Sequence, residues 1–98
     1  MIKVILKRRV KPQNYGRLIG LLHDLRAAAI HQPGYITGET VMRGENPIEV
    51  LAIGSWLSER HWQAWATSQA RNELESMVDL LIVGKVETTV YVVPAEDI

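Results

Sequence analysis

The stretch GYITGETVMRGENPIEVLAIGSW, residues 34–56, decides the fold of this chain. Its two halves, residues 34–44 and 48–56, are rich in β-branched and aromatic side chains, which favour strands. The short segment GENP between them, residues 44–47, has the composition of a tight turn. We therefore expect an antiparallel hairpin.

Segments of regular periodicity lie on both sides of this hairpin. Residues 1–10 alternate as a strand does, and residues 13–31 carry leucines at helical spacing. Residues 59–81 predict a helix with a break in the polar stretch 67–72, and residues 85–93 predict a last strand. The order β-α-β-β-α-β is that of the ferredoxin-like α+β fold, in which two helices cover one face of a four-stranded antiparallel sheet. We expect residues 1–98 to form this single domain.

The composition excludes several classes of function. The 11 basic and 11 acidic side chains cancel, so no net field attracts nucleic acid or an anionic membrane. The chain has no cysteine, which excludes disulfides, thiolate metal sites and a cysteine nucleophile. It has no apolar run of the roughly 20 residues that a membrane span needs, and its start lacks the order of a signal peptide. We expect a cytoplasmic protein that binds neither nucleic acid nor a membrane.

The second face of the predicted sheet carries apolar side chains. If Trp56 points toward the helices, then so do alternate residues back to Ile48 along the same strand. The other face then carries a further apolar set: Leu51, Ile53, Ile5, Tyr91 and Val93. Scattered surface apolar residues are one explanation. A homodimer, in which the sheet of a second copy packs here, is the explanation we favour.

All three tryptophans fall within ten residues, in a chain without phenylalanine. Trp62 and Trp65 lie three residues apart on a predicted helix, where a tryptophan-rich core is one interpretation and a ligand-binding wall is the other. Trp56 ends a strand beside a helix start, where clefts form, and its ring N–H needs a polar partner. Trp56 is therefore a candidate for orienting a polar ligand.

Three charged or titratable residues are further candidates. His61 falls in the first turn of a helix, where the helix dipole favours a neutral imidazole able to act as a base; an ordinary solvent-exposed histidine is the alternative. Arg8 shares a strand face with apolar residues, so it either holds an anionic substrate oxygen or pairs with Glu39 or Glu75. Glu39 is either a functional charge or an ordinary charge on an edge strand. The three histidines lack ligand spacing, so we expect no metal site.

The sequence also resembles a known family. The pattern GYI at residues 34–36, ET at 39–40 and GSWxSxxxWxxWxxS at 54–68 resembles the antibiotic biosynthesis monooxygenase (ABM) domain family. The resemblance covers nearly the whole chain. It implies a dimeric α/β barrel built from two ferredoxin-like chains, and a homodimer as the working form.

The resemblance implies a monooxygenase that needs no cofactor and oxidises a hydroquinone-type or polyphenolic aromatic with dioxygen. Such a reaction needs a dry aromatic pocket, a base and a donor that stabilises the substrate anion. Trp56 is the candidate wall and N–H donor, His61 or Glu39 the base, and Arg8 or Arg71 the group that stabilises the anion. The remaining candidate substrate-binding residues are Trp62, Trp65 and Tyr35.

Two alternatives remain open. Some members of the family bind and degrade heme, using an asparagine on the first strand and a histidine ligand on the second helix. Here Arg8 stands near the first position and residues 72–77 contain no histidine, so heme oxygenation in the same manner is not expected. The other alternative is a domain that binds a small aromatic molecule without turning it over.

Overall fold

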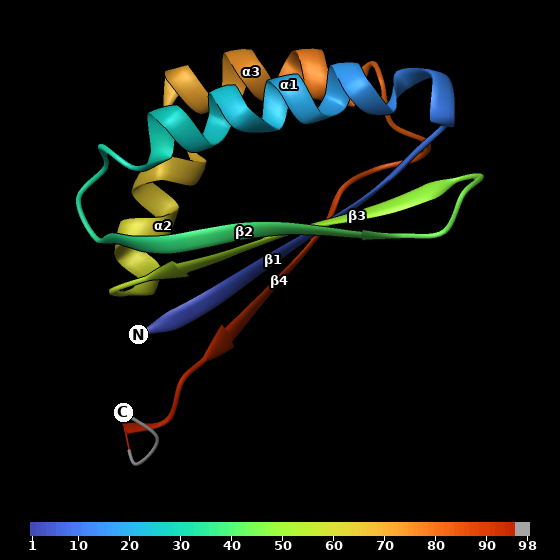
Figure 1. Ribbon diagram of the computed structural model, residues 1–98. Coiled ribbons are helices and arrows are strands. Elements are labelled where there is room, and N and C mark those ends of the chain that lie inside the picture. The colour runs from blue at the N-terminus through green and yellow to red at the C-terminus, as the bar shows by residue number, and fades with distance from the viewer. Residues whose placement is uncertain (96–98) are drawn as a thin grey trace.

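A computed structural model describes residues 1–95. These residues form one antiparallel sheet with helices on one of its faces (Figure 1). In chain order the elements are β1 (Ile2–Val10), α1 (Pro12–Ala29), β2 (Tyr35–Arg43), β3 (Ile48–Trp56), α2 (Glu59–Ala66), α3 (Gln69–Asp79) and β4 (Glu87–Val92). The spatial order of the strands is β2-β3-β1-β4. The predicted ferredoxin-like α+β fold is confirmed; the last three residues of the predicted domain lie outside the described range.

The helical layer follows the predicted pattern, including the break within residues 67–72. Helix α1 starts with Pro12 in its first turn and buries one stripe of side chains: Leu18, Leu22, Leu25 and Ala29. The second predicted helix is two helices, α2 and α3, because the chain breaks at Thr67. The Ser58 side chain caps α2, and Ser68 caps α3 in the same way.

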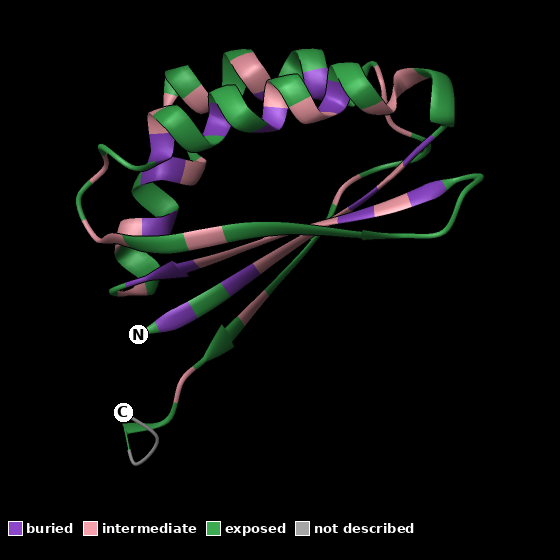
Figure 2. Cartoon of the chain, viewed as in Figure 1, coloured by how far each residue is buried: buried purple, intermediate pink, exposed green. Residues whose placement is uncertain are grey.

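The core lies between this layer and the sheet (Figure 2). Alternation along β3 is confirmed, because Ile48, Val50 and Trp56 are all buried against the helices. Arg8 on β1 pairs in register with Val50 and is also buried. A charged side chain therefore lies inside an otherwise apolar layer.

The opposite face of the sheet has no cover within residues 1–95 (Figure 1). Ile5, Ile53 and Glu39 form one row across β1, β3 and β2 on this face. In the next row Leu51 pairs with Val41 on β2. Apolar and charged side chains are therefore mixed on the open face. Within the same residues, no helix is both long and apolar enough to cross a membrane.

Candidate functional site

A cavity of about 100 Å³ lies between the helices and the sheet. Its floor runs along β1 past alternate residues Val4, Leu6 and Arg8. Helix α1 closes one side with Leu22, Leu25 and Ala29, and α2 adds the rings of Trp62 and Trp65. Six of the described elements contribute to the cavity, so its shape depends on the whole fold.

Two glycines make part of the floor flat. Gly38 on β2 and Gly54 on β3 are direct cross-strand partners, and both line the cavity. A Cβ on Gly38 would lie 2.9 Å from the hydroxyl oxygen of Tyr35. A Cβ on Gly54 would lie 3.3 Å from Nε1 of Trp56. A planar group can therefore approach the backbone here, near one phenol and one indole N–H.

A charged cluster lies where β1 meets α3. Arg8 Nη2 donates a hydrogen bond of 2.6 Å to Glu75 Oε1, and Arg71 Nη2 lies 3.5 Å from the same oxygen. The side chains are 1% (Arg8), 11% (Glu75) and 13% (Arg71) exposed. Burial lowers the pKa of Arg8, and the Glu75 carboxylate opposes that shift. Arginine stays protonated under such conditions, so two cations share one carboxylate.

This cluster leaves one donor unused. The Nε–H of Arg8 is the single buried side-chain polar group without a hydrogen-bond partner within residues 1–95. Arg71 is held in place by other contacts, because its guanidinium lies 5.2 Å from the ring centre of Trp62 and donates to the carbonyl of Ala66. The Arg8 end of the cavity is therefore positively charged and can accept a further oxygen ligand.

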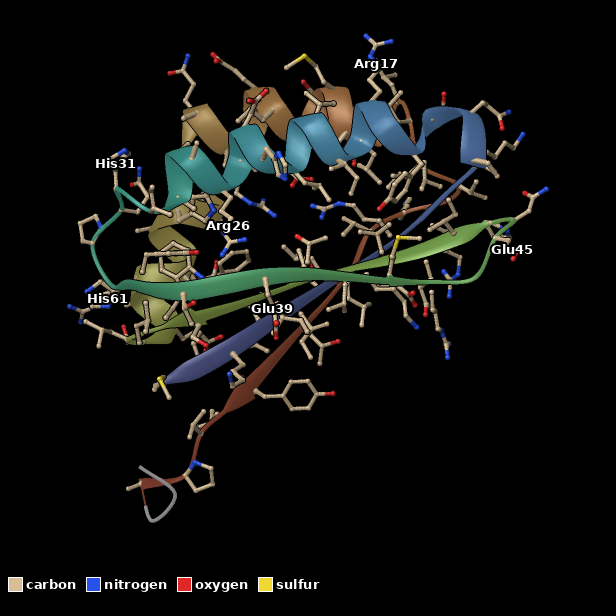
Figure 3. The ribbon with its side chains drawn as sticks, in the orientation of Figure 1. Arg17, Arg26, His31, Glu39, Glu45 and His61 are labelled. Carbon is tan, nitrogen blue, oxygen red and sulfur yellow. The ribbon has the colours of Figure 1, made fainter. Side chains whose placement is uncertain are left out.

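Arg26 lies at the mouth of the cavity. It extends from α1 into the space between α1 and β2, where its guanidinium donates a hydrogen bond to the carbonyl of Gly38 (Figure 3). The residue is exposed and also lines the cavity. Sequence reasoning missed Arg26 as a site residue. The sequence feature that could have identified Arg26 is its position on α1 beside the apolar stripe, between Leu22 and Ala29.

Six of the eight sequence-predicted site residues line this cavity: Arg8, Tyr35, Glu39, Trp62, Trp65 and Arg71. Trp56 lies behind the wall rather than in it. Its ring packs edge-on against Tyr35 at 5.4 Å and Trp62 at 5.9 Å between centroids, and the residue is 2% exposed. Trp56 therefore supports two rings that line the cavity. Of the two partners considered for Arg8, the structure has Glu75 and not Glu39.

The two candidate bases point elsewhere. Glu39 borders the cavity through its backbone position, but its side chain shares the open face with Ile53 (Figure 3). His61 lies at the outer end of α2, away from the cavity (Figure 3). Its Nδ1 is 2.7 Å from the Ser58 hydroxyl, and its ring packs on Gly34. The predicted base roles of both residues therefore have no support from their positions.

The cavity does not fit heme. No histidine lines it among the residues that the structure describes, and those residues contain no group of side chains able to hold a metal ion. Pockets for drug-sized ligands are about 300–1,000 Å³ in volume. A cavity of about 100 Å³ is too small for a porphyrin.

Solved structures of similar fold superpose on nearly the whole chain. A conserved protein from Methanosarcina mazei Go1 is 21% identical, with a TM-score of 0.84 over 92% of this chain and 89% of that one. An antibiotic biosynthesis monooxygenase is 16% identical, with a TM-score of 0.83 over 96% of this chain and 100% of that one. SnoaB, a cofactor-independent oxygenase from Streptomyces nogalater, is 10% identical, with a TM-score of 0.78 over 95% and 93%.

These likenesses confirm the resemblance in fold that the sequence pattern indicated. The chain has the fold of the antibiotic biosynthesis monooxygenases. No protein-family model matches the sequence, and no curated protein matches it.

Proposed function

We propose that this chain, which shares the fold of the antibiotic biosynthesis monooxygenases, oxidises a hydroquinone-type or polyphenolic aromatic with dioxygen and without a cofactor. The observation that carries the proposal is the cavity, which has aromatic walls, a flat glycine floor and a buried guanidinium cluster. These are the groups that an electron-rich ring and its anion need. SnoaB and its named relatives add support through a common fold.

The substrate supplies all the electrons in this reaction. A hydroquinone loses a proton, and a ring carbon of its anion forms a bond to dioxygen. The resulting hydroperoxide loses its ring C–H proton, its O–O bond breaks, and water leaves. For the simplest case, hydroquinone and dioxygen give hydroxyquinone and water, and the atoms balance. The protein needs to bind the ring, stabilise its anion and exclude water.

The residues of the cavity divide these tasks. Tyr35 has its hydroxyl beside Gly38, where it donates to a ring oxygen. Arg8 and Arg71 stabilise negative charge on the substrate. A phenol has a pKa near 10, and the positive charge of the Arg8 and Arg71 pair lowers the pKa of a phenol bound in the cavity. The phenol can then lose its proton to solvent while it enters, before water is excluded, so the reaction does not depend on a base at His61 or Glu39.

One variant tests these roles directly. Tyr35→Phe keeps the ring that packs on Trp56 and removes only the hydroxyl. Losing one donor that stabilises a developing anion lowers kcat by roughly 100-fold. We expect that loss in oxygen uptake with a panel of hydroquinones, measured against a protein-free blank, with an unchanged melting temperature.

Glu39→Gln and His61→Ala are the controls for this experiment. Both residues were candidate bases, and both side chains point away from the cavity. We expect both variants to keep the wild-type rate of oxygen uptake. A large loss in either variant, with Tyr35→Phe unaffected, would contradict the assigned roles.

A second function is favoured by one observation. Glu75 is the only carboxylate whose side chain contacts the cavity's charged cluster within residues 1–95, and two arginines already occupy it. A cavity without a free base suits a domain that binds an aromatic molecule without turnover. Stable binding with no oxygen uptake across the panel would favour this second function.

We also propose that the protein forms a homodimer through the open face of its sheet. The open face of the sheet carries Leu51, Ile53 and Ile5, which are half-buried in a single chain. Apolar sheet surface of this kind is normally covered. Packing two such faces together gives the dimeric α/β barrel that the family resemblance implies.

Leu51→Glu is expected to separate the dimer into monomers. The new carboxylate lies opposite Lys7 in register, so the single chain tolerates it, whereas a buried sheet-to-sheet interface does not. Light scattering at micromolar concentration measures the mass. Leu80→Glu, at a position 84% exposed on the helical side, is the control and should stay dimeric. A wild-type chain that is monomeric at 100-fold higher concentration would rule the dimer out.

A further inference from the structure

We infer that the ligand of the cavity is a single aromatic ring that carries a carboxylate at one end and a hydroxyl at the other. The inference rests on the proposed function in one respect, namely that the ligand contains an electron-rich aromatic ring. Three independent features of the cavity carry it: its volume, its charge and its polarity along β1.

The volume limits the ligand to one ring. An apolar cavity of about 150 Å³ in another protein is known to hold benzene. The cavity here is of the same order, at about 100 Å³, and it opens to solvent beside Arg26, so one ring fits with its substituents directed toward the two ends. Val4, Leu22 and Leu25 surround it and are themselves buried in the core. Close-packed side chains of this kind do not move aside for a second fused ring without strain.

The positive charge of the arginines that line the cavity favours an anionic ligand. Arg8, Arg71 and Arg26 line the cavity, and within residues 1–95 Glu75 is the only carboxylate in contact with this cluster, whereas Asp79 acts on Arg8 from farther away. Glu39 does not compensate, because its side chain lies on the other face of the sheet. Uncompensated positive charge is costly to bury, and a ligand carboxylate relieves that cost. A hydroquinone without an acid group is neutral near pH 7 and brings no such charge.

The unpartnered Nε–H of Arg8 favours a ligand that brings a carboxylate oxygen. Arg8 is 1% exposed, and its Nε–H has no partner within residues 1–95, although its Nη2 binds Glu75. A guanidinium presents Nε–H and Nη–H donors in a planar fork that matches a carboxylate. A ligand carboxylate beside Arg8 and Arg71 satisfies that donor and balances the second cation.

The two ends of the cavity differ in chemistry. Val4 pairs with Gly54 at one end, and Arg8 follows four residues later on β1, a separation of about 13 Å between Cα atoms at the usual strand rise. The Gly54 end has the Tyr35 hydroxyl and Nε1 of Trp56 nearby. A carboxylate at Arg8 thus places a ring on the glycine floor and its far hydroxyl near Tyr35.

Anaerobic calorimetry with four defined probes tests the inference separately from turnover. The probes are 2,5-dihydroxybenzoate, 2,5-dihydroxybenzamide, hydroquinone and 1,4-dihydroxy-2-naphthoate. We expect the benzoate to bind at least tenfold more tightly than each of the other three. Equal affinity for the acid and the amide would overturn the carboxylate, and tighter binding of the naphthoate would overturn the single ring.

Two variants locate the carboxylate. Arg71→Met keeps an unbranched apolar side chain and removes the charge, so the preference for acid over amide should fall about tenfold. Arg71→Lys retains the charge and should retain part of the preference. Arg43→Met, which removes a surface charge paired with Glu49, is the control and should change nothing. An unchanged preference in Arg71→Met would overturn the assigned position.

The two proposals fail in different ways. Selective binding of the benzoate without oxygen uptake would refute the monooxygenase and keep the ligand class. Oxygen uptake with hydroquinones, but no preference for the acid, would refute the ligand class and keep the monooxygenase.

Discussion

Glu75→Leu is expected to lower the free energy of unfolding by about 3–5 kcal/mol, the usual cost of removing one partner from a buried ion pair. Glu75 is the carboxylate between Arg8 and Arg71, and the Arg8 side chain is only 1% exposed. Without Glu75, two guanidinium groups remain close together at the edge of the core, with only the more distant Asp79 opposing their charge. The added apolar surface of leucine does not offset that loss. Urea denaturation at neutral pH measures the change.

Two further variants identify the cause. Glu73→Leu lies on the same helix, at an exposed position, and should change stability by no more than about 0.5 kcal/mol. The double variant Arg8→Met with Glu75→Leu should recover much of the loss, since an apolar replacement of a whole buried pair is often neutral. If Glu75→Leu costs no more than Glu73→Leu, the ion pair does not contribute as its geometry implies.

The same comparison separates stability from function. A buried ion pair is weak evidence for stability, because apolar side chains of similar volume stabilise a core at least as well. The cluster of Arg8, Glu75 and Arg71 is therefore better explained by what it binds. The double variant should be nearly as stable as the wild type and should lose its preference for a ligand carboxylate. A stable variant with reduced binding is the outcome that a purely structural role does not produce.

Sequence reasoning succeeded where periodicity decides the answer. Alternation along 48–56 placed Trp56 on the helix-facing side of β3, and the same rule placed Arg8 inside. The polar stretch after Ala66 indicated the break between α2 and α3. Each of these features depends on neighbouring residues only.

The position of Glu39 on the open face has a specific physical cause. Tyr35 lies opposite Trp56 and faces the helices, so simple alternation would turn Glu39 to the same side. A β-bulge between Tyr35 and Thr37 inserts one extra residue and reverses the alternation. Gly38 therefore faces the cavity, and Glu39 faces away. No single residue type in this stretch predicts a bulge.

His61 shows a different limit. It is adjacent to Trp62 in sequence, but one residue along a helix turns the side chain by about 100°. Trp62 consequently faces the cavity, and His61 faces outward onto Gly34. Proximity in sequence to the tryptophans was therefore a poor guide to proximity in space.

Gly34→Ala is expected to be the most damaging of the Gly→Ala changes, with a loss of free energy of unfolding of about 2–5 kcal/mol. Gly34 has a φ of +85°, a conformation that costs other residues about 1–2 kcal/mol. Its Cβ would also lie 2.5 Å from Cβ of His61 and would overlap the imidazole. Overpacking of this kind costs about a further 1–3 kcal/mol. His61 has little freedom to move, because both its backbone N–H and its ring bind Ser58.

Gly84→Ala isolates the contribution of the contact. Gly84 has a similar φ of +73°, but a Cβ there meets no atom within 4 Å. The difference between the two variants in urea denaturation therefore measures the contact between Gly34 and His61, and we expect at least about 1 kcal/mol. Equal losses would mean that the imidazole does not pack on Gly34. The His61 side chain would then be free to turn from the end of α2 toward Trp62. Its position would no longer argue against the hypothesis that it acts as a base.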